Sequence, residues 1–140
     1  MTQLIHEIMT QQLHSIRSEA TLLEVATLMR DRRIGTVLVT SRDGTLRGIV
    51  TGRDIVVRAM AEARPLDRTQ AWEICSNDLV KVAPTTSIEA TKQLMRERAI
   101  RRVPVVANGV AVGIVSLGDL ARQAQSNLAA STIGVFGETG

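Results

Sequence analysis

Two short segments of the chain combine a hydroxyl residue and a carboxylate at a spacing that could bind a sugar. They read GIVTGRD over residues 48–54 and GIVSLGD over residues 113–119. In each segment a Thr or Ser ends an apolar strand, and an Asp follows three positions later in the first turn of an expected helix. This spacing brings two oxygen groups to one helix end, beside free backbone N–H groups, where they could accept both hydroxyls of a ribose. The candidate residues are Thr51, Asp54, Ser116 and Asp119.

The same spacing also matches an ordinary capping box, in which the two side chains only satisfy the backbone N–H groups of the helix. A carboxylate is favourable there because of the positive end of the helix dipole. Three features favour a ligand-binding role. Both copies use Asp where Glu is usual, both follow a Gly-Ile-Val strand, and Thr21-x-x-Glu24 shows an ordinary box elsewhere in the chain. The spacing alone leaves both interpretations open.

A pair of arginines, Arg101 and Arg102, stands directly before the apolar stretch Val103–Val106. Guanidinium groups are directional donors for phosphate oxygens. The matching segment of the first copy, residues 35–38, has neither arginine nor proline. We therefore expect any anion site to differ between the copies, and the alternative is a solvated arginine pair on the surface.

These features recur because the chain consists of two similar halves. The segment LMRDRRI at 28–34 returns as LMRERAI at 94–100, and the offset of 66 becomes 65 after the first hairpin. Two copies are too few for a solenoid, which needs about three or more. Each copy of about 60 residues could bury only a marginal core alone. We therefore expect two half-domains packed on one another around a pseudo-twofold cleft.

The pattern of apolar residues and turns predicts the order β-α-β-β-α in each copy, a mixed α/β (α+β) fold. Short apolar stretches come first, and helices then open at Thr21 and Ser87. A hairpin follows, through Asp43-Gly44 or Asn108-Gly109, which predicts type I′ turns with positive φ at both central residues. A last helix opens at the hydroxyl residue. The expected strands are Leu13–Ile16, Thr36–Thr40, Leu46–Val50, Leu79–Val82, Val103–Val106 and Val110–Val115.

The expected boundaries are residues 1–61 for the first repeat, 62–71 for a linker, 72–125 for the second repeat and 126–140 for a C-terminal tail. The linker contains Pro65 and several charges without apolar periodicity. For the tail, a frayed end is favoured, as is usual for termini. The alternative is an apolar arm whose Ile133, Val135 and Phe136 dock on a partner.

Composition argues against several functions. The chain has 140 residues and a formal charge of +3, no apolar run of about 18 residues and no targeting signal, so we expect a cytoplasmic protein without a membrane partner. Cys75 is the single cysteine, which excludes an internal disulfide. Together with His6 and His14 it lacks zinc-site spacing, so no metal is expected. No histidine lies near either Asp cluster, and Cys75 has no evident base partner, so we expect no enzyme. The two aromatic residues offer no stacking platform for nucleic acid.

The two GIV-[TS]-x-x-D segments, the IRRVPVV strand and the Met-Thr and Cys-Ser pairs before each first strand resemble a tandem pair of CBS (cystathionine-β-synthase-type) domains, also called a Bateman module. The resemblance covers about residues 4–125. It implies two pseudo-symmetric repeats packed through their sheets, with AMP, ATP or S-adenosylmethionine as a regulatory ligand in the cleft and no required cofactor. Leu38 stands where the family usually has a proline, which puts the symmetry of the two pockets in question.

By position, the resemblance places the two Asp carboxylates at the ribose hydroxyls and the two hydroxyl residues beside the sugar or first phosphate. The two arginines would meet phosphates, and the backbone near two strand valines would face the adenine. The implied ligand-binding residues are Asp54, Asp119, Thr51, Ser116, Arg101, Arg102, Val37 and Val103.

The leading hypothesis is a small regulatory module, without catalytic activity, that binds an adenine nucleotide and acts through a partner protein or through dimer geometry. We expect a homodimer in which an apolar strip on the helices forms the contact. The expected strip contains Ile55, Val56, Met60 and Leu120. The alternative is a stress or interaction protein that keeps the fold but has an empty cleft. A titration with ATP, AMP and S-adenosylmethionine separates the two.

Overall fold

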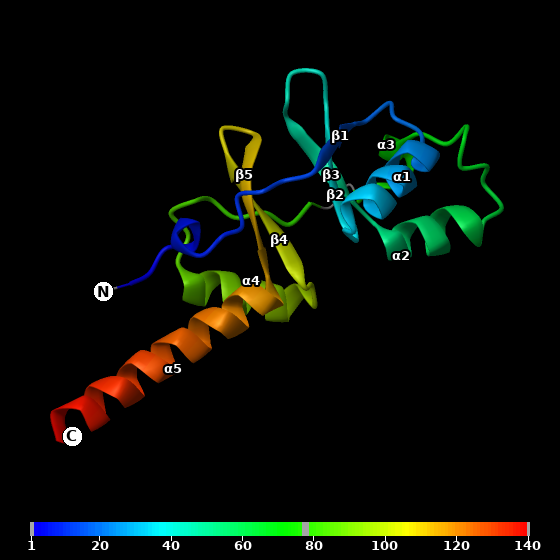
Figure 1. Ribbon diagram of the computed structural model, residues 1–140. Helices are drawn as coiled ribbons and strands as arrows, with labels where there is room; N and C mark the ends of the chain where they lie inside the picture. Colours follow the sequence, from blue (N-terminus) through cyan, green and yellow to red (C-terminus); the bar gives the residue numbers. More distant parts are fainter. Residues whose placement is uncertain (1, 77–78, 140) are drawn as a thin grey trace. The chain divides into compact units, whose positions relative to one another are not determined.

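The computed structural model describes the backbone of residues 2–76 and 79–139 and the side chains of this part up to Leu128 (Figure 1). The chain divides into two compact units. The first-repeat unit contains residues 12–80 and 108–111, and the second-repeat unit contains residues 1–11, 81–107 and 112–140. The first segment of each repeat therefore belongs to the unit of the other repeat.

The first-repeat unit is built on a three-stranded sheet in the order β1-β2-β3 (Figure 1). The short strand β1 (Ser15–Arg17) pairs in parallel with β2 (Thr36–Thr40), and β2 pairs antiparallel with β3 (Leu46–Thr51). Its helices are α1 (Leu22–Arg32), α2 (Gly52–Asp54), the π-helix η2 (Ile55–Met60) and α3 (Ala71–Ile74).

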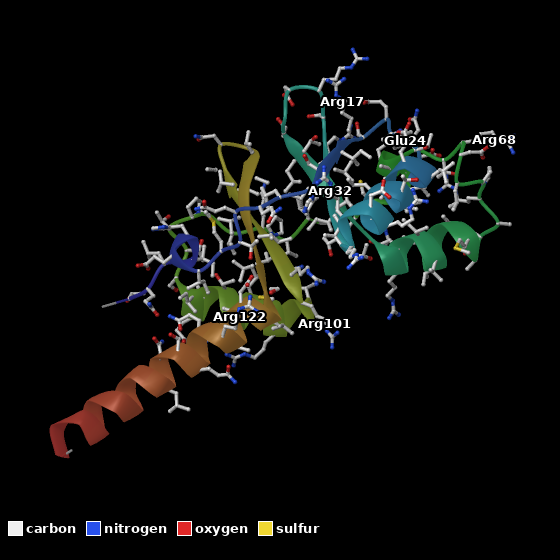
Figure 2. All side chains as sticks on the ribbon, viewed as in Figure 1. Arg17, Glu24, Arg32, Arg68, Arg101 and Arg122 are labelled. Carbon is white, nitrogen blue, oxygen red and sulfur yellow. The ribbon has the colours of Figure 1, made fainter. Side chains whose placement is uncertain are left out.

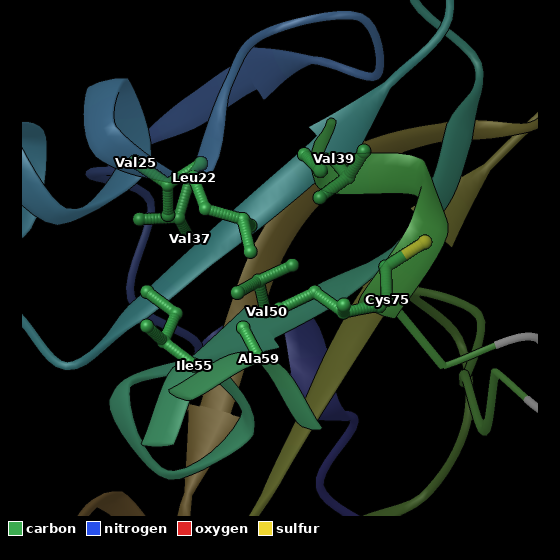
Figure 3. Close-up of a cluster of buried hydrophobic side chains, with 10 residues drawn as sticks. Leu22, Val25, Val37, Val39, Val50, Ile55, Ala59 and Cys75 are labelled. Atoms are coloured by element: carbon green, nitrogen blue, oxygen red, sulfur yellow. The ribbon is translucent and has the colours of Figure 1, made fainter. Parts of the chain in front are cut away.

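Apolar residues of the sheet and of the helices form the core of this unit (Figure 3). Helix α1 begins as predicted: Thr21 Oγ1 accepts from the Glu24 N–H at 3.2 Å, and the Thr21 N–H donates to Glu24 Oε2 at 3.1 Å. This capping box satisfies two donors at the helix start and orients the apolar face of α1 toward the strands. The buried core residues are Leu22, Val25, Val37, Val39, Val50, Ile55, Ala59, Ala71, Ile74 and Cys75.

The second-repeat unit contains the 3-10 helix η1 (Ile5–Glu7), α4 (Ile88–Arg98), β4 (Arg102–Ala107), β5 (Val110–Ser116) and α5 (Leu117–Thr139). Strands β4 and β5 pair with each other. Ser87 opens α4 as predicted, since its Oγ accepts from the Ala90 N–H at 3.1 Å. The buried apolar residues of this unit include Ile5, Ile88, Met95, Val103, Val105, Val115 and Leu120.

The predicted order β-α-β-β-α is present, but the first strand of the second repeat is reduced to a single parallel bridge between Val82 and Val105. The reason is two prolines. In the first repeat, the Leu38 N–H donates to the His14 carbonyl at 2.9 Å before β1, and the Ser18 N–H donates to the Thr40 carbonyl at 2.8 Å after it. The residues equivalent to Leu38 and Ser18 are Pro104 and Pro84, which have no N–H to donate. The expected strand Leu79–Val82 therefore cannot extend in the same way.

The two hairpin turns differ from one another. Asn108 and Gly109 have φ of 53° and 82°, as predicted for a type I′ turn. In the first hairpin only Gly44 has a positive φ, of 87°, so the expectation of positive φ at Asp43 was wrong. The extra residue there makes a wider loop, in which the Asp43 carboxylate accepts from the Ser41 hydroxyl at 2.5 Å and from the Thr45 N–H at 3.0 Å. These hydrogen bonds lower the pKa of Asp43 to about 2.

Helix α5 continues to Thr139, whereas the sequence had favoured a frayed end after residue 125. The stretch contains no proline that would stop a helix. The side chains of Ile133, Val135 and Phe136 lie outside the described residues, so the apolar arm stays a prediction. In the described part of the chain, no helix combines the length and the apolar character that crossing a membrane requires.

Candidate functional site

The first hydroxyl–carboxylate pair lies where β3 ends and α2 begins. Thr51 Oγ1 accepts from the Asp54 N–H at 3.1 Å, and the Thr51 N–H donates to Asp54 Oδ2 at 2.8 Å. The capping box proposed as the alternative interpretation is therefore formed. It uses one carboxylate oxygen only. Among the hydrogen bonds of the described residues, Asp54 Oδ1 accepts none, and the side chain is partly exposed.

The second pair repeats this geometry between β5 and α5. Ser116 Oγ accepts from the Asp119 N–H at 3.1 Å, and the Ser116 N–H donates to Asp119 Oδ2 at 2.9 Å. Here the other oxygen is also in use, because the Arg122 guanidinium forms an ion pair with Oδ1. The Thr10 hydroxyl lies 3.5 Å from both carboxylate oxygens. Asp119 is only 8% exposed.

Thr36 completes a cluster of hydroxyl groups in the first-repeat unit. It begins β2 and lies opposite Thr51 of β3 in the antiparallel register, so the two side chains are on the same face of the sheet. Its Oγ1 is buried and has no hydrogen-bond partner among the described residues. A buried hydroxyl without a partner costs about 1–3 kcal/mol. Thr36 was not predicted as a site residue, and its only signal in the sequence is its position, which matches Arg102 of the second copy.

The other residues implied by the resemblance have simpler surroundings. Val37 and Val103 are fully buried, so the proposed contact of their backbone with an adenine stays a prediction. Arg101 and Arg102 are exposed (Figure 2 labels Arg101), and neither forms an ion pair with another described residue. The Arg101 carbonyl accepts from the Leu117 N–H at 3.0 Å, which connects this segment to the start of α5.

The glycine that precedes each candidate strand end permits close packing. A Cβ atom at Gly48 would lie 2.8 Å from the Ser76 carbonyl oxygen and 2.9 Å from Cys75 Sγ. A Cβ atom at Gly113 would overlap the side chain of Met9. The segments that approach these glycines are the Met-Thr and Cys-Ser pairs, each provided by the other copy.

The described residues offer little to acid–base, thiol or metal chemistry. Burial raises the pKa of the Cys75 thiol, so it stays protonated at neutral pH. Its Sγ lies 3.6 Å from the Trp72 carbonyl oxygen. Among the described residues, no three His, Cys, Asp or Glu side chains converge into a group that could hold a metal ion.

Two β-α-β-β-α repeats, each with a hydroxyl and a carboxylate at the start of its last helix, define a tandem pair of small α/β domains. The chain belongs to the CBS domain family, whose model matches residues 5–60 and 71–126. This confirms the resemblance seen in the sequence and the assignment of two repeats.

Relatives of similar length have the same organisation. The CBS domain-containing protein YhcV of Bacillus subtilis is 38% identical over 128 residues, which are 91% of this chain and 90% of that protein. Hypoxic response protein 1 of Mycobacterium tuberculosis is 32% identical over 116 residues, 83% of this chain and 81% of that protein. A crystal structure of Hypoxic Response Protein I with two coordinated zinc ions superposes with a TM-score of 0.81 at 30% identity, over 86% of this chain and 98% of that chain.

A more distant structure shares the fold. It is a CBS domain pair in complex with 5′-methylthioadenosine and S-adenosyl-L-methionine, with a TM-score of 0.79 at 23% identity, over 90% of this chain and 98% of that chain. CBS domain pairs are generally regulatory rather than catalytic modules.

Proposed function

We propose that this CBS domain pair binds an adenosine-containing nucleotide through its hydroxyl–carboxylate helix starts and regulates a partner protein or its own assembly in response. The observation that carries the proposal is the cluster at Asp54. One carboxylate oxygen has no hydrogen bond among the described residues, and a buried hydroxyl, that of Thr36, lacks a partner. A ribose diol supplies two donors for the carboxylate and acceptor oxygens for the hydroxyl.

The remaining candidate residues fit the same ligand in their own surroundings. The backbone N–H groups of Thr51 and Ser116 hold the two carboxylates in place, as one half of each capping box. Arg101 and Arg102 are exposed guanidinium groups that are free to meet phosphate oxygens. The complex with 5′-methylthioadenosine and S-adenosyl-L-methionine supports an adenosine ligand for this fold, in that protein.

A panel of AMP, ATP, S-adenosylmethionine and adenosine tests the proposal. At a ligand concentration of about 100 times Kd, binding to the native state alone adds about 2.7 kcal/mol of stability. For a chain of this size we expect a rise in Tm of about 5–10 °C. 2′,3′-Dideoxyadenosine is the matched control, and we expect it to bind at least about tenfold more weakly than adenosine because it lacks both diol donors.

The alternative, a ligand-independent stress or interaction protein, predicts a different result. In that case no adenine ligand changes Tm or produces heat in calorimetry at millimolar concentration. Equal affinity for adenosine and its dideoxy analogue would show that the carboxylates do not hold the ribose.

We further propose that the chain forms a homodimer through its helices. In η2, Val56, Val57 and Met60 are 55%, 50% and 59% exposed. The predicted strip was wrong in two members, because Ile55 and Leu120 are each only 6% exposed and belong to their own cores. Separately, within the second-repeat unit, there is an apolar groove of about 480 Å³. Its lining includes Met95, Ile100, Leu117, Leu120 and Ala121.

Light scattering tests the dimer. We expect a mass near twice the 15.2 kDa of one chain at micromolar concentration, because contiguous exposed apolar residues mark association surfaces. Met60→Glu should shift the mass toward that of the monomer, whereas Glu62→Gln, in the turn that follows, should leave it unchanged. A wild-type mass of one chain at this concentration would contradict the proposal.

A further inference from the structure

We infer that the two hydroxyl–carboxylate sites are unequal: the site formed by Thr36, Thr51 and Asp54 takes the nucleoside, and Arg122 together with Thr10 closes the site at Asp119. The inference rests on the proposed function, since it states which of the two candidate sites performs it. It comes from a comparison of the two carboxylates, each within its own unit.

The carboxylate of the first-repeat unit has a free oxygen. Its Oδ2 accepts the Thr51 N–H at 2.8 Å, whereas Oδ1 of Asp54 accepts no hydrogen bond from a described residue. The same β2–β3 end carries the buried Thr36 hydroxyl, which lacks a partner. A diol that binds here satisfies groups of the protein that are otherwise left without hydrogen bonds.

The carboxylate of the second-repeat unit is already satisfied on both oxygens. Oδ2 of Asp119 accepts the Ser116 N–H at 2.9 Å, and Oδ1 is held by Arg122, one turn further along α5 (Figure 2 labels Arg122). The hydroxyl of Thr10 lies 3.5 Å from each oxygen. A hollow of about 350 Å³ beside Asp119 is lined by Arg122 as well, so an entering diol competes with a guanidinium for the same oxygen.

The sequence difference between the copies increases this inequality. The residue equivalent to Thr36 in the second copy is Arg102, whose exposed side chain leaves no buried hydroxyl for a ligand to satisfy. A diol at Asp119 must therefore displace Arg122 without the compensation that Thr36 provides. The Arg122 side chain is 71% exposed, so its ion pair contributes at most about 1 kcal/mol, and we expect the diol to bind more tightly at Asp54 than at Asp119.

Matched substitutions with adenosine as the probe test the inference. Asn keeps the oxygen that accepts the backbone N–H of each capping box but removes the negative charge. In isothermal titration calorimetry we expect one site per wild-type chain. Asp54→Asn should weaken adenosine at least tenfold, and Asp119→Asn should change its affinity by no more than about twofold. Arg122→Gln should add a second, weaker site by releasing Asp119.

The Thr36→Val variant tests whether the Thr36 hydroxyl contacts the ligand or only stabilises the fold. Valine has nearly the same shape and removes a buried hydroxyl that has no partner, so we expect Tm to be unchanged or raised while adenosine binds several-fold more weakly. Thr40→Val is the control in the same strand, because the Thr40 hydroxyl donates to the Ile16 carbonyl at 3.4 Å. This control should lower Tm and leave the affinity unchanged.

The outcomes distinguish the inference from the proposed function. If adenosine binds but Asp119→Asn weakens it as much as Asp54→Asn, or more, the sites are not unequal in the stated sense and the inference is wrong, while the proposed function stands. A lowered Tm with unchanged affinity for Thr36→Val also overturns it. If no adenine ligand binds the wild-type chain, both the proposed function and the inference are wrong.

Discussion

Replacing Gly48 with alanine is expected to lower the free energy of unfolding by about 2–3 kcal/mol, at the upper end of the usual cost of overpacking. The added Cβ would lie 2.8 Å from the Ser76 carbonyl oxygen and 2.9 Å from Cys75 Sγ. The carbonyl oxygen belongs to the backbone and cannot rotate away, so the strand β3 or the segment after α3 has to move. Thermal unfolding should show a Tm lower by several degrees.

Gly113→Ala is the matched comparison because it lies at the equivalent position of the second repeat. Its Cβ would meet Sδ and Cγ of Met9, atoms of a flexible side chain, while the Met9 Cβ lies 3.1 Å away. We expect this variant to cost about 1 kcal/mol, because the Met9 side chain can change rotamer. A larger cost for Gly113→Ala than for Gly48→Ala would contradict this account.

Double mutants identify which atoms cause the loss of stability in the two Gly→Ala variants. Met9→Ala should recover most of the loss in Gly113→Ala, because it removes the two overlapping atoms. Cys75→Ala should recover little in Gly48→Ala, since the Ser76 carbonyl oxygen remains in place. The coupling energy from each double-mutant cycle measures the direct contact.

Local patterns in the sequence were enough to predict most of the fold. The capping residues Thr21 and Ser87, the last helices at Thr51 and Ser116 and the turn at Asn108-Gly109 all depend on neighbouring residues in the chain. The duplicated pattern supplied the order of elements, which the CBS family match confirms. The shortened first strand of the second repeat depends on Pro104 and Pro84, whose effect could have been found by aligning them with Leu38 and Ser18.

Only part of the candidate site could be predicted from the sequence. The spacing predicted the hydroxyl–carboxylate pairs, and the structure shows that both form capping boxes. The ion pair of Arg122 with Asp119 has ordinary i,i+3 helix spacing. This spacing alone does not indicate that Arg122 occupies an oxygen of the candidate site. The unpartnered hydroxyl of Thr36 could not be predicted, because burial and missing partners depend on the packing of the whole unit.

The sequence also gave no indication that the first segment of each repeat packs in the unit of the other repeat. Residues 5–11 resemble residues 71–77 in pattern, so each segment could have packed on its own repeat. In the structure, the Thr10 N–H donates to the Ile114 carbonyl at 2.8 Å, and the Ile114 N–H donates to the Thr10 carbonyl at 2.9 Å. The Ile5 N–H donates to the Thr86 carbonyl at 2.7 Å. The start of the chain is thus a structural part of the second-repeat unit.

Ile5→Ala is therefore expected to destabilise the second-repeat unit, although the residue lies at the start of the first repeat. Ile5 is fully buried, and truncating a buried isoleucine costs about 2–5 kcal/mol. Native-state amide exchange should become faster in α4 and β5 and should change much less in β2 and β3, because local openings follow cooperative units. Ile8→Ala is the control from the same segment, and its partly exposed side chain should cost clearly less.

Ile74→Ala provides the reciprocal experiment. Ile74 lies at the start of the second repeat but is 2% exposed in the core of the first-repeat unit, in the same cluster as Val50 and Ala59. We expect a loss of about 2–5 kcal/mol with faster exchange in β2 and β3 and little change in α4. If Ile5→Ala instead loosens β2 and β3, and Ile74→Ala loosens α4, each segment packs on its own repeat and the exchange is wrong. Because each unit contains a segment of the other repeat, neither repeat can complete its core if the chain is cut between them.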